Sequence, residues 1–535
     1  MVRRSRRIPR PLLVLLLVTL VAGLAWTYAV PALQGADESA HFGYVQKIAD
    51  AGEIPWRHSE TGLLQAAYPP SVSTEQWTAW LWAGLEPLRG NVAARPLWTR
   101  EDERIWRAVD DRTVGHDQKI DAIGNNAWLN PPLYYLTAAV PYKIAGGTLF
   151  DRLYAMRVYG VLLLMATVAL TWLLAGEVFG RRRELQTVAT AAVALQPVLL
   201  DVTTRVTPDA LLVPLCAGAL YLMAVIAQRG PGWRQVLALV AVVVAAGFTQ
   251  GRALGLVAPA VFAMGVGWWR WRRGATATAD GASPPSGSRL AAAAGGASSP
   301  SGSRLAAAAG GASPPSGSRL AAAAGGASPP RGSRLAAAAG WAVAVVVVLV
   351  VVAVYATRLR FGELTGFWSY LWQFYLPKLP GMSAPVGPEW GAQQVYLDRF
   401  FGTFVQFEVG FPRDLLNLVR DLIWVGLVLL AVAAWRRRRL LAGHAAAVLV
   451  LLVAAALVIL SLHAAAFRSL LVNPADPVIT GRYLLMLVPL YGVAIAGAAS
   501  ALPGRIRAAG TGALLAGLVL LQLSAFGIVV ARFYA

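Results

Sequence analysis

A pair of adjacent carboxylates followed by a histidine stands just after the first long apolar run of the chain. The local sequence is Gly35-Ala36-Asp37-Glu38-Ser39-Ala40-His41-Phe42. Charged side chains beside a membrane helix are costly to desolvate, so they mark a functional site by default. If a helix begins near Asp37, Asp37 and His41 share one face and Glu38 points elsewhere. Asp37 could then act as a general base toward a substrate hydroxyl, with His41 as a proton or phosphate partner.

The same residues also fit an ordinary helix N-terminus. In that case Asp37 caps the helix and Glu38 favours the positive end of the helix dipole. In a catalytic site, Glu38 and Asp209 could orient the base or hold a divalent cation such as Mg²⁺ or Mn²⁺. Asp37 and Glu38 are the candidate ligands for such a cation, but two oxygen ligands are too few to identify a metal. These alternatives stay open at this point.

Polar residues in the turns between later apolar runs form a second group of candidates. They are Arg205, Asp209, Arg252, Arg468, Arg482 and Tyr483. The planar guanidinium group binds oxyanions through two parallel hydrogen bonds, so these arginines suit a phosphate or pyrophosphate. The alternative is simple ion pairing within the protein, for instance between Arg205 and Asp209. Carboxylates and arginines are predicted to meet on one face.

The composition requires a membrane as the solvent for most of these segments. Of 535 residues, 57% are hydrophobic and 14% are charged, which is more apolar surface than a soluble protein of this length could bury. The formal charge of +20 does not indicate nucleic acid, because the arginine clusters flank apolar runs. That placement is typical of topology signals on the cytoplasmic side. Nucleic acid is therefore not an expected partner, whereas membrane lipids are.

Continuous apolar runs predict an all-α integral membrane protein with about 11 transmembrane helices. The runs lie near 11–31, 153–179, 186–203, 208–228, 234–249, 253–270, 341–357, 417–435, 442–465, 481–500 and 511–531. The stretch 132–147 is short, rich in tyrosine and bracketed by prolines, which favours an interfacial helix. With the N-terminus inside and the C-terminus outside, the arginine clusters fall in the cytoplasm. Two large loops, 32–152 and 358–416, then lie outside.

Three parts follow along the chain. Residues 1–273 are predicted to form an N-terminal membrane catalytic module, and 341–535 a C-terminal membrane module. Between them, 281–340 are four tandem copies of a 15-residue unit rich in Gly, Ser, Pro and Ala. Such a composition cannot repay the entropy of ordering, so 274–340 is predicted to be a disordered cytoplasmic linker.

The layout resembles the C-type superfamily of membrane glycosyltransferases, which use lipid-phosphate sugars. Members carry an acidic pair just beyond the first span and a later Pro-Pro segment, and Asp37-Glu38 and Pro131-Pro132 fit this pattern. More narrowly, the chain resembles a bacterial family of multi-pass membrane proteins catalogued as a domain of unknown function. Three strings carry that likeness: Asp37-Glu38-Ser39-Ala40-His41-Phe42, Thr207-Pro208-Asp209 and Gly481-Arg482-Tyr483. The resemblance implies an inverting sugar transfer from a polyprenyl-phosphate donor, with Asp37 as the base.

The sequence thus leads to the hypothesis of a multi-pass glycosyltransferase in a bacterial plasma membrane. Its expected partners are a polyprenyl-phosphate-linked sugar donor and a cell-envelope glycan or lipid acceptor on the outer face. A transporter or flippase of lipid-linked glycans is the first alternative, since intramembrane charges also mark substrate pathways. A non-catalytic protein of cell-envelope assembly is the second.

Overall fold

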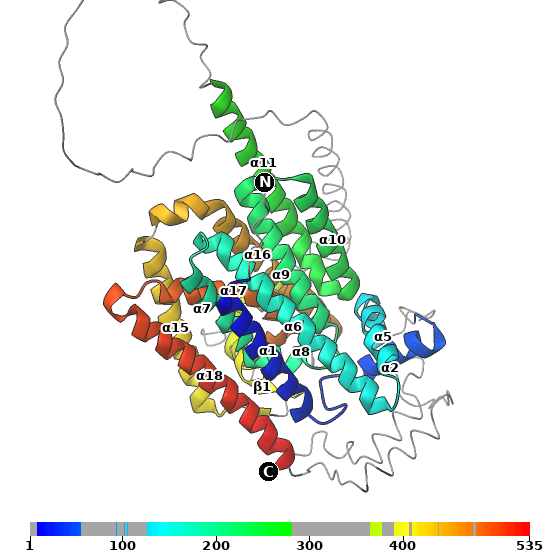
Figure 1. Ribbon diagram of the computed structural model, residues 1–535. Helices are drawn as coiled ribbons and strands as arrows, with labels where there is room; N and C mark the ends of the chain where they lie inside the picture. Colours follow the sequence, from blue (N-terminus) through cyan, green and yellow to red (C-terminus); the bar gives the residue numbers. More distant parts are fainter. Residues whose placement is uncertain are drawn as a thin grey trace, which may run out of the picture.

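The computed structural model describes residues 8–54, 126–280, 364–376, 390–405, 409–436, 438–473 and 478–535, together with positions 93, 101 and 104. The predicted span 341–357 and the repeats 281–340 lie outside the described residues. The described chain is helical apart from one short antiparallel hairpin, β1 (Thr403–Phe404) and β2 (Val409–Gly410). Figure 1 shows the helices gathered side by side into one bundle.

Long helices make up the bundle. They are α1 (Arg10–Ala29), α6 (Leu149–Phe179), α9 (Asp209–Arg229), α10 (Trp233–Thr249), α11 (Val257–Asp280), α15 (Arg413–Arg436), α16 (Arg438–Val472) and α18 (Gly504–Tyr534). Shorter helices are α2 (Glu38–Ala51), α5 (Leu133–Ala145), α7 (Arg183–Ala194), α8 (Pro197–Thr203), α13 (Leu364–Tyr375), α14 (Arg399–Phe401) and α17 (Val488–Ala499). The 3₁₀ turns are η2 (Asn126–Leu129), η3 (Gly251–Leu256) and η6 (Gly481–Leu487), and η5 (Ala392–Asp398) is a π-helix.

Eight helices of the described chain are long and apolar enough to cross a membrane, or nine if the bent pair α7–α8 counts as one span. This shows a polytopic helical protein, whereas the count of eleven and the orientation stay predictions. The predicted span 234–249 is α10, a shorter apolar helix of 17 residues. The predicted interfacial stretch 132–147 holds α5, a helix of 13 residues that is not among the candidate spans.

Helix α9 lies at the centre of the bundle. It packs against α6, α10, α11 and α16, and 78% of its most apolar window is buried. Because α9 begins at Asp209, its position carries the Thr207-Pro208-Asp209 turn deep into the protein. The packing of α9 in the hydrophobic core therefore fixes the position of Asp209.

A break between α7 and α8 turns the chain before it reaches Arg205. Pro197 lacks a backbone N–H and restricts Gln196 to an extended conformation, so the helix cannot continue through this point. The two helices meet at 57°. The Gln196 side chain caps α8 at Leu199 N–H, and its amide donates a hydrogen bond of 2.5 Å to the carbonyl of Phe400. The break thereby ties the N-terminal half of the chain to the segment that follows η5.

Two similar turns deliver the later arginines. In each, an extended residue (Gln250 or Thr480) precedes a Gly-Arg pair that opens a 3₁₀ turn, η3 or η6. Gly481 is required for space, because a Cβ there would lie 2.2 Å from the carbonyl oxygen of Tyr396. Both turns therefore place an arginine at the second position of a tight helical turn.

Candidate active site

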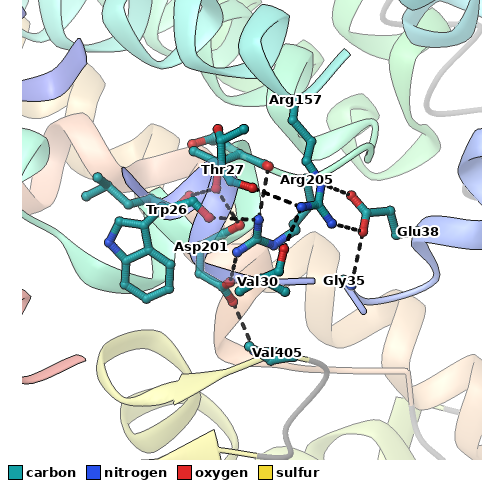
Figure 2. Close-up of polar contacts among 12 residues, drawn as sticks. Trp26, Thr27, Val30, Gly35, Glu38, Arg157, Asp201, Arg205 and Val405 are labelled. Carbon is teal, nitrogen blue, oxygen red and sulfur yellow. Dashed lines mark hydrogen bonds and ion pairs between the residues drawn. The ribbon is translucent and has the colours of Figure 1, made fainter. Parts of the chain in front are cut away.

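A buried arginine from α6 fixes the chain where α1 ends and α2 begins. Arg157 donates from Nε to Glu38 Oε1 at 2.8 Å and from Nη2 to Glu38 Oε2 at 2.5 Å. It also donates to three backbone carbonyls, those of Thr27 at 2.9 Å, Val30 at 2.7 Å and Pro31 at 3.0 Å. Figure 2 shows this guanidinium surrounded by its acceptors. A guanidinium has five N–H groups, and each is used.

All hydrogen-bond acceptor positions of the Glu38 carboxylate are also occupied. Besides Arg157, it accepts hydrogen bonds from Val206 N–H at 3.1 Å and Gly35 N–H at 3.2 Å. A carboxylate offers about four acceptor positions, so none is left for a metal ion or a substrate proton. Burial raises the pKa of Glu38, but the ion pair with Arg157 outweighs it and the pKa is lowered. Of the two roles considered for Glu38, this geometry fits orientation of the neighbouring residue.

Asp37, next in the chain, has a very different environment. It is half-buried, and its side chain makes no hydrogen bond or ion pair with the residues that the structure describes. It precedes α2 without capping it, so the capping alternative is wrong. Its φ of 54° lies in the left-handed region, which non-glycine residues seldom adopt and which is often found at functional sites. The structure thus presents an available carboxylate on a constrained backbone.

His41 lies one turn into α2. Its Nδ1 is joined to the hydroxyl of Tyr135 by a hydrogen bond of 2.9 Å, and the Tyr135 ring stacks on Tyr44 with centroids 3.8 Å apart. Burial lowers the pKa of His41 to about 4; Asp37 acts to raise it, and Arg482 and Arg252 act to lower it further. His41 is therefore neutral near pH 7. The segment that begins Asn130-Pro131-Pro132 supplies its partner Tyr135.

Asp209 gathers two arginines at the start of α9. It forms ion pairs with Arg252 and with Arg482, whose Nε lies 3.2 Å from Asp209 Oδ2. Arg252 also lies over the ring of Tyr483, 4.1 Å from its centroid. These four predicted residues, 209, 252, 482 and 483, are therefore brought together.

Arg205 does not pair with Asp209, so that suggested ion pair is wrong. It donates from Nη2 to Asp201 Oδ1 at 3.2 Å and from Nη1 to the carbonyl of Trp26 at 3.1 Å. Asp201 Oδ2 in turn accepts the N–H of Val405 at 3.1 Å, which joins Arg205 to the hairpin (Figure 2). Burial lowers the pKa of Arg205, and Arg157 adds to this effect. The turn 204–208 folds back toward Trp26 in α1, which is why the local pairing suggested by spacing is not formed.

A small pocket with a cavity volume of about 30 Å³ lies between Arg205 and Arg482. Its lining includes Gly35 and Ala36 beside Asp37, together with Arg205, Arg399 and Arg482 from three separate segments. Asp201 is the carboxylate in that lining. Three guanidinium groups against one carboxylate make the pocket suitable for an anion.

A buried polar atom in this lining reinforces that interpretation. Arg205 Nε is buried without a hydrogen-bond partner in the described part of the chain. The same holds for Gln250 Oε1 and Thr480 Oγ1, which directly precede the two Gly-Arg turns. Buried polar groups are nearly always paired, so such atoms indicate a site for a polar ligand or water.

Arg399 is the arginine of the pocket lining that the sequence did not single out. It begins α14, in the loop predicted to lie outside (358–416). A single arginine among aromatic residues gave no signal apart from its place in that loop. Arg468, which was predicted to bind substrate, is half-buried in α16, and no described contact joins it to the Asp209 cluster.

A divalent cation is the last candidate group at this site. Within them, no group of three or more His, Cys, Asp or Glu side chains could hold a metal ion. The divalent cation considered for Asp37 and Glu38 stays a prediction.

Part of the chain matches the model of a known protein family. The family model described as dolichyl-phosphate-mannose-protein mannosyltransferase matches residues 130–278. No curated protein and no solved structure matches the chain. The matched stretch contains Tyr135, Arg157, Arg205, Asp209 and Arg252, and Asp37 precedes it. Through this similarity to mannosyltransferases, the match supports a membrane glycosyltransferase of the C type.

Proposed function

We propose that the protein transfers a sugar from a polyprenyl-phosphate donor to a hydroxyl of a cell-envelope glycan or lipid, on the extracytoplasmic face of a bacterial plasma membrane. One observation carries the proposal: the carboxylate of Asp37, without a hydrogen bond or ion pair among the described residues, directly follows Gly35 and Ala36 in the lining of a pocket with three arginines. A base for the acceptor and a cationic site for the leaving group are the two elements that this reaction needs.

Asp37 accepts the proton of the acceptor hydroxyl as its oxygen attacks the anomeric carbon of the donor. The bond from that carbon to the phosphate oxygen breaks, and its electron pair leaves with the polyprenyl phosphate. Attack from the face opposite the phosphate inverts the anomeric configuration. The products are the glycosylated acceptor, the lipid phosphate and a protonated Asp37, which returns its proton to solvent.

The arginines act on the charge that develops. A phosphate bound to both sugar and lipid carries one negative charge, and it gains a second as the sugar departs. Arg205, Arg399 and Arg482 surround the pocket, and preorganised donors of this kind stabilise a transition state more than a ground state. Arg252 does not line the pocket. It acts indirectly, through its ion pair with Asp209 and its contact with the ring of Tyr483.

His41 keeps the base available. A neutral imidazole does not form a salt bridge with Asp37, so the carboxylate stays free to accept a proton. Its hydrogen bond to Tyr135 fixes the ring orientation relative to α5.

The test is transfer of radiolabelled sugar from polyprenyl-phosphate donors to membrane glycans in proteoliposomes, with wild type compared with Asp37→Asn. Loss of a general base typically lowers rates by about 10²- to 10⁴-fold, so we expect incorporation to fall by that factor while donor binding persists. Asp414→Asn, an exposed acid at the start of α15, is the matched control and should retain full transfer.

Equal incorporation by wild type and Asp37→Asn would exclude this mechanism. Movement of the lipid-linked sugar between leaflets without incorporation would instead identify a transporter. Donor binding that survives every substitution, with no transfer and no movement, would identify an assembly protein.

A further inference from the structure

An apolar groove lies between α11 and α16, away from the arginine pocket. It is an open groove with a volume of about 550 Å³. Its lining is apolar, from Phe262 and Val266 on α11 to Ala446 and Leu449 on α16, with the single exception of Arg270. Figure 1 shows these two helices near each other in the bundle.

The two helices run in opposite directions along the groove. Gly255, at the start of the α11 span, approaches Ser461 and Val458 late in α16. Arg270, at the far end of that span, lines the groove together with Ala445, early in α16. The groove therefore lies toward the end of the bundle opposite Arg252.

The length of the helix puts Arg270 at the opposite membrane surface. Adding the rise of η3 to that of α11 as far as Arg270 gives about 33 Å from Gly251. The hydrocarbon core of a bilayer is about 30 Å thick. The candidate span Gly251–Arg272 is therefore long enough to cross this core, and we infer that Arg270, near its end, lies at the level of the lipid head groups.

The groove has a polar end and an apolar end, as a phospholipid does. Arg270 and the half-exposed Trp269 stand at the head-group level, where tryptophan and arginine favour the interface. Phe262 lies two turns deeper, about 12 Å toward the bilayer centre, at the level of acyl chains. A cation at the polar end and no carboxylate in the lining favour a negative head group over a zwitterionic one.

We propose that this groove binds an anionic phospholipid, with its phosphate at Arg270 and one acyl chain along the groove toward Phe262 and Leu449. The site is separate from the arginine pocket, and lipid binding there does not depend on the proposed sugar transfer.

Native mass spectrometry of the purified full chain tests this, with phosphatidylglycerol and phosphatidylcholine of the same acyl chains as probes. We expect phosphatidylglycerol to bind more tightly. Arg270→Gln should weaken its binding about fivefold and leave phosphatidylcholine unchanged. Arg272→Gln, which removes a nearby exposed cation outside the groove lining, is the control and should have no effect.

A second pair of variants tests the apolar part. Ala445→Leu places a larger side chain in the groove and should weaken binding of both lipids, whereas Ala456→Leu, exposed on the same helix but beyond the groove, should not. Unchanged thermal unfolding of each variant verifies that it is folded. Equal affinity for the two lipids, or no effect of Arg270→Gln, would overturn the proposal. No effect of Ala445→Leu would also overturn it, because the lipid would then bind outside the groove.

Discussion

Asp37 and Glu38 are neighbours in the chain, yet their side chains have opposite surroundings. Glu38 is enclosed by Arg157 and two backbone N–H groups, while Asp37 is left half-exposed beside the pocket. The buried pair holds the end of α1 against α6, and Asp37 takes its constrained backbone from that anchor. Asp37 is thus available for chemistry because the ion pair of Glu38 with Arg157 holds this part of the chain in place.

Removing the charge of Glu38 should therefore damage the fold before it damages the chemistry. Glu38→Gln leaves the guanidinium of Arg157 buried without its counter-charge, and breaking a buried ion pair costs about 3–5 kcal/mol. We expect a clear fall in the melting temperature, measured by thermal unfolding in detergent. Glu53→Gln removes an exposed partner of Lys47 and should change little. A Glu38→Gln protein as stable as wild type would contradict the anchoring role.

The neutral His41 makes stability depend on acid pH. Because burial lowers its pKa to about 4, the unfolded chain binds a proton on His41 below about pH 6.5 while the folded chain does not. The contribution of His41 to stability is therefore complete above about pH 6.5 and is lost as the pH falls toward 4. His41→Gln should flatten the fall in melting temperature across this range. Tyr135→Phe, which removes the hydrogen bond but no titrating imidazole, should retain it.

Single residues also show where sequence reasoning stops. Arg252 and Arg482 could be recognised because each follows a glycine at the start of an apolar run. The partner of Arg205 could not, because Asp201 and Asp209 are each four residues away and only the fold of the 204–208 turn decides between them. Arg399 could not be found either, since its role depends on a loop that approaches the α8–α9 turn in space alone.

Among the elements, the two Gly-Arg turns provide a matched comparison. Gly481→Ala would place a methyl group 2.2 Å from the Tyr396 carbonyl, so η6 must shift and move Arg482 away from Asp209. We expect weaker donor binding and lower transfer by about tenfold or more, in line with a displacement of about 1 Å. Gly251→Ala, at the same position of η3, meets no atom within 4 Å and should be tolerated. Equal effects of the two substitutions would show that crowding at η6 is unimportant.

Apolar runs of the sequence predicted most long helices well, because burial and length alone define them. They do not predict how a proline bends a run. The run 186–203 predicts one span, and in the structure Gln196-Pro197 bends it by 57° between α7 and α8, which together form either one broken span or a re-entrant loop. The left-handed backbone at Asp37 was also beyond prediction, since it is imposed by the anchoring of Glu38 on Arg157.

At the scale of the whole molecule, the two parts of the chain that precede and follow the repeats in sequence are packed against each other. Helix α17 packs on α7 and α16 on α9, and residues of both halves share the largest hydrophobic cluster. We therefore expect two fragments, cut within 281–340 and co-expressed, to assemble and recover most transfer activity. Each fragment alone should be inactive because Arg399 and Arg482 belong to the second. A cut within 204–208 is the control and should abolish activity. Failure of the 281–340 fragments to associate in a pull-down would contradict this expectation.

The buried arginine–carboxylate pairs also affect how the protein responds to its medium. Mobile ions screen charges in water over about 8–10 Å at physiological salt, but they do not enter a packed interior. Arg205 and its partner Asp201 are almost fully buried, so their arrangement is set by internal contacts and not by the surrounding electrolyte. A protein with such pairs keeps the same internal arrangement of charges in dilute and in saline surroundings.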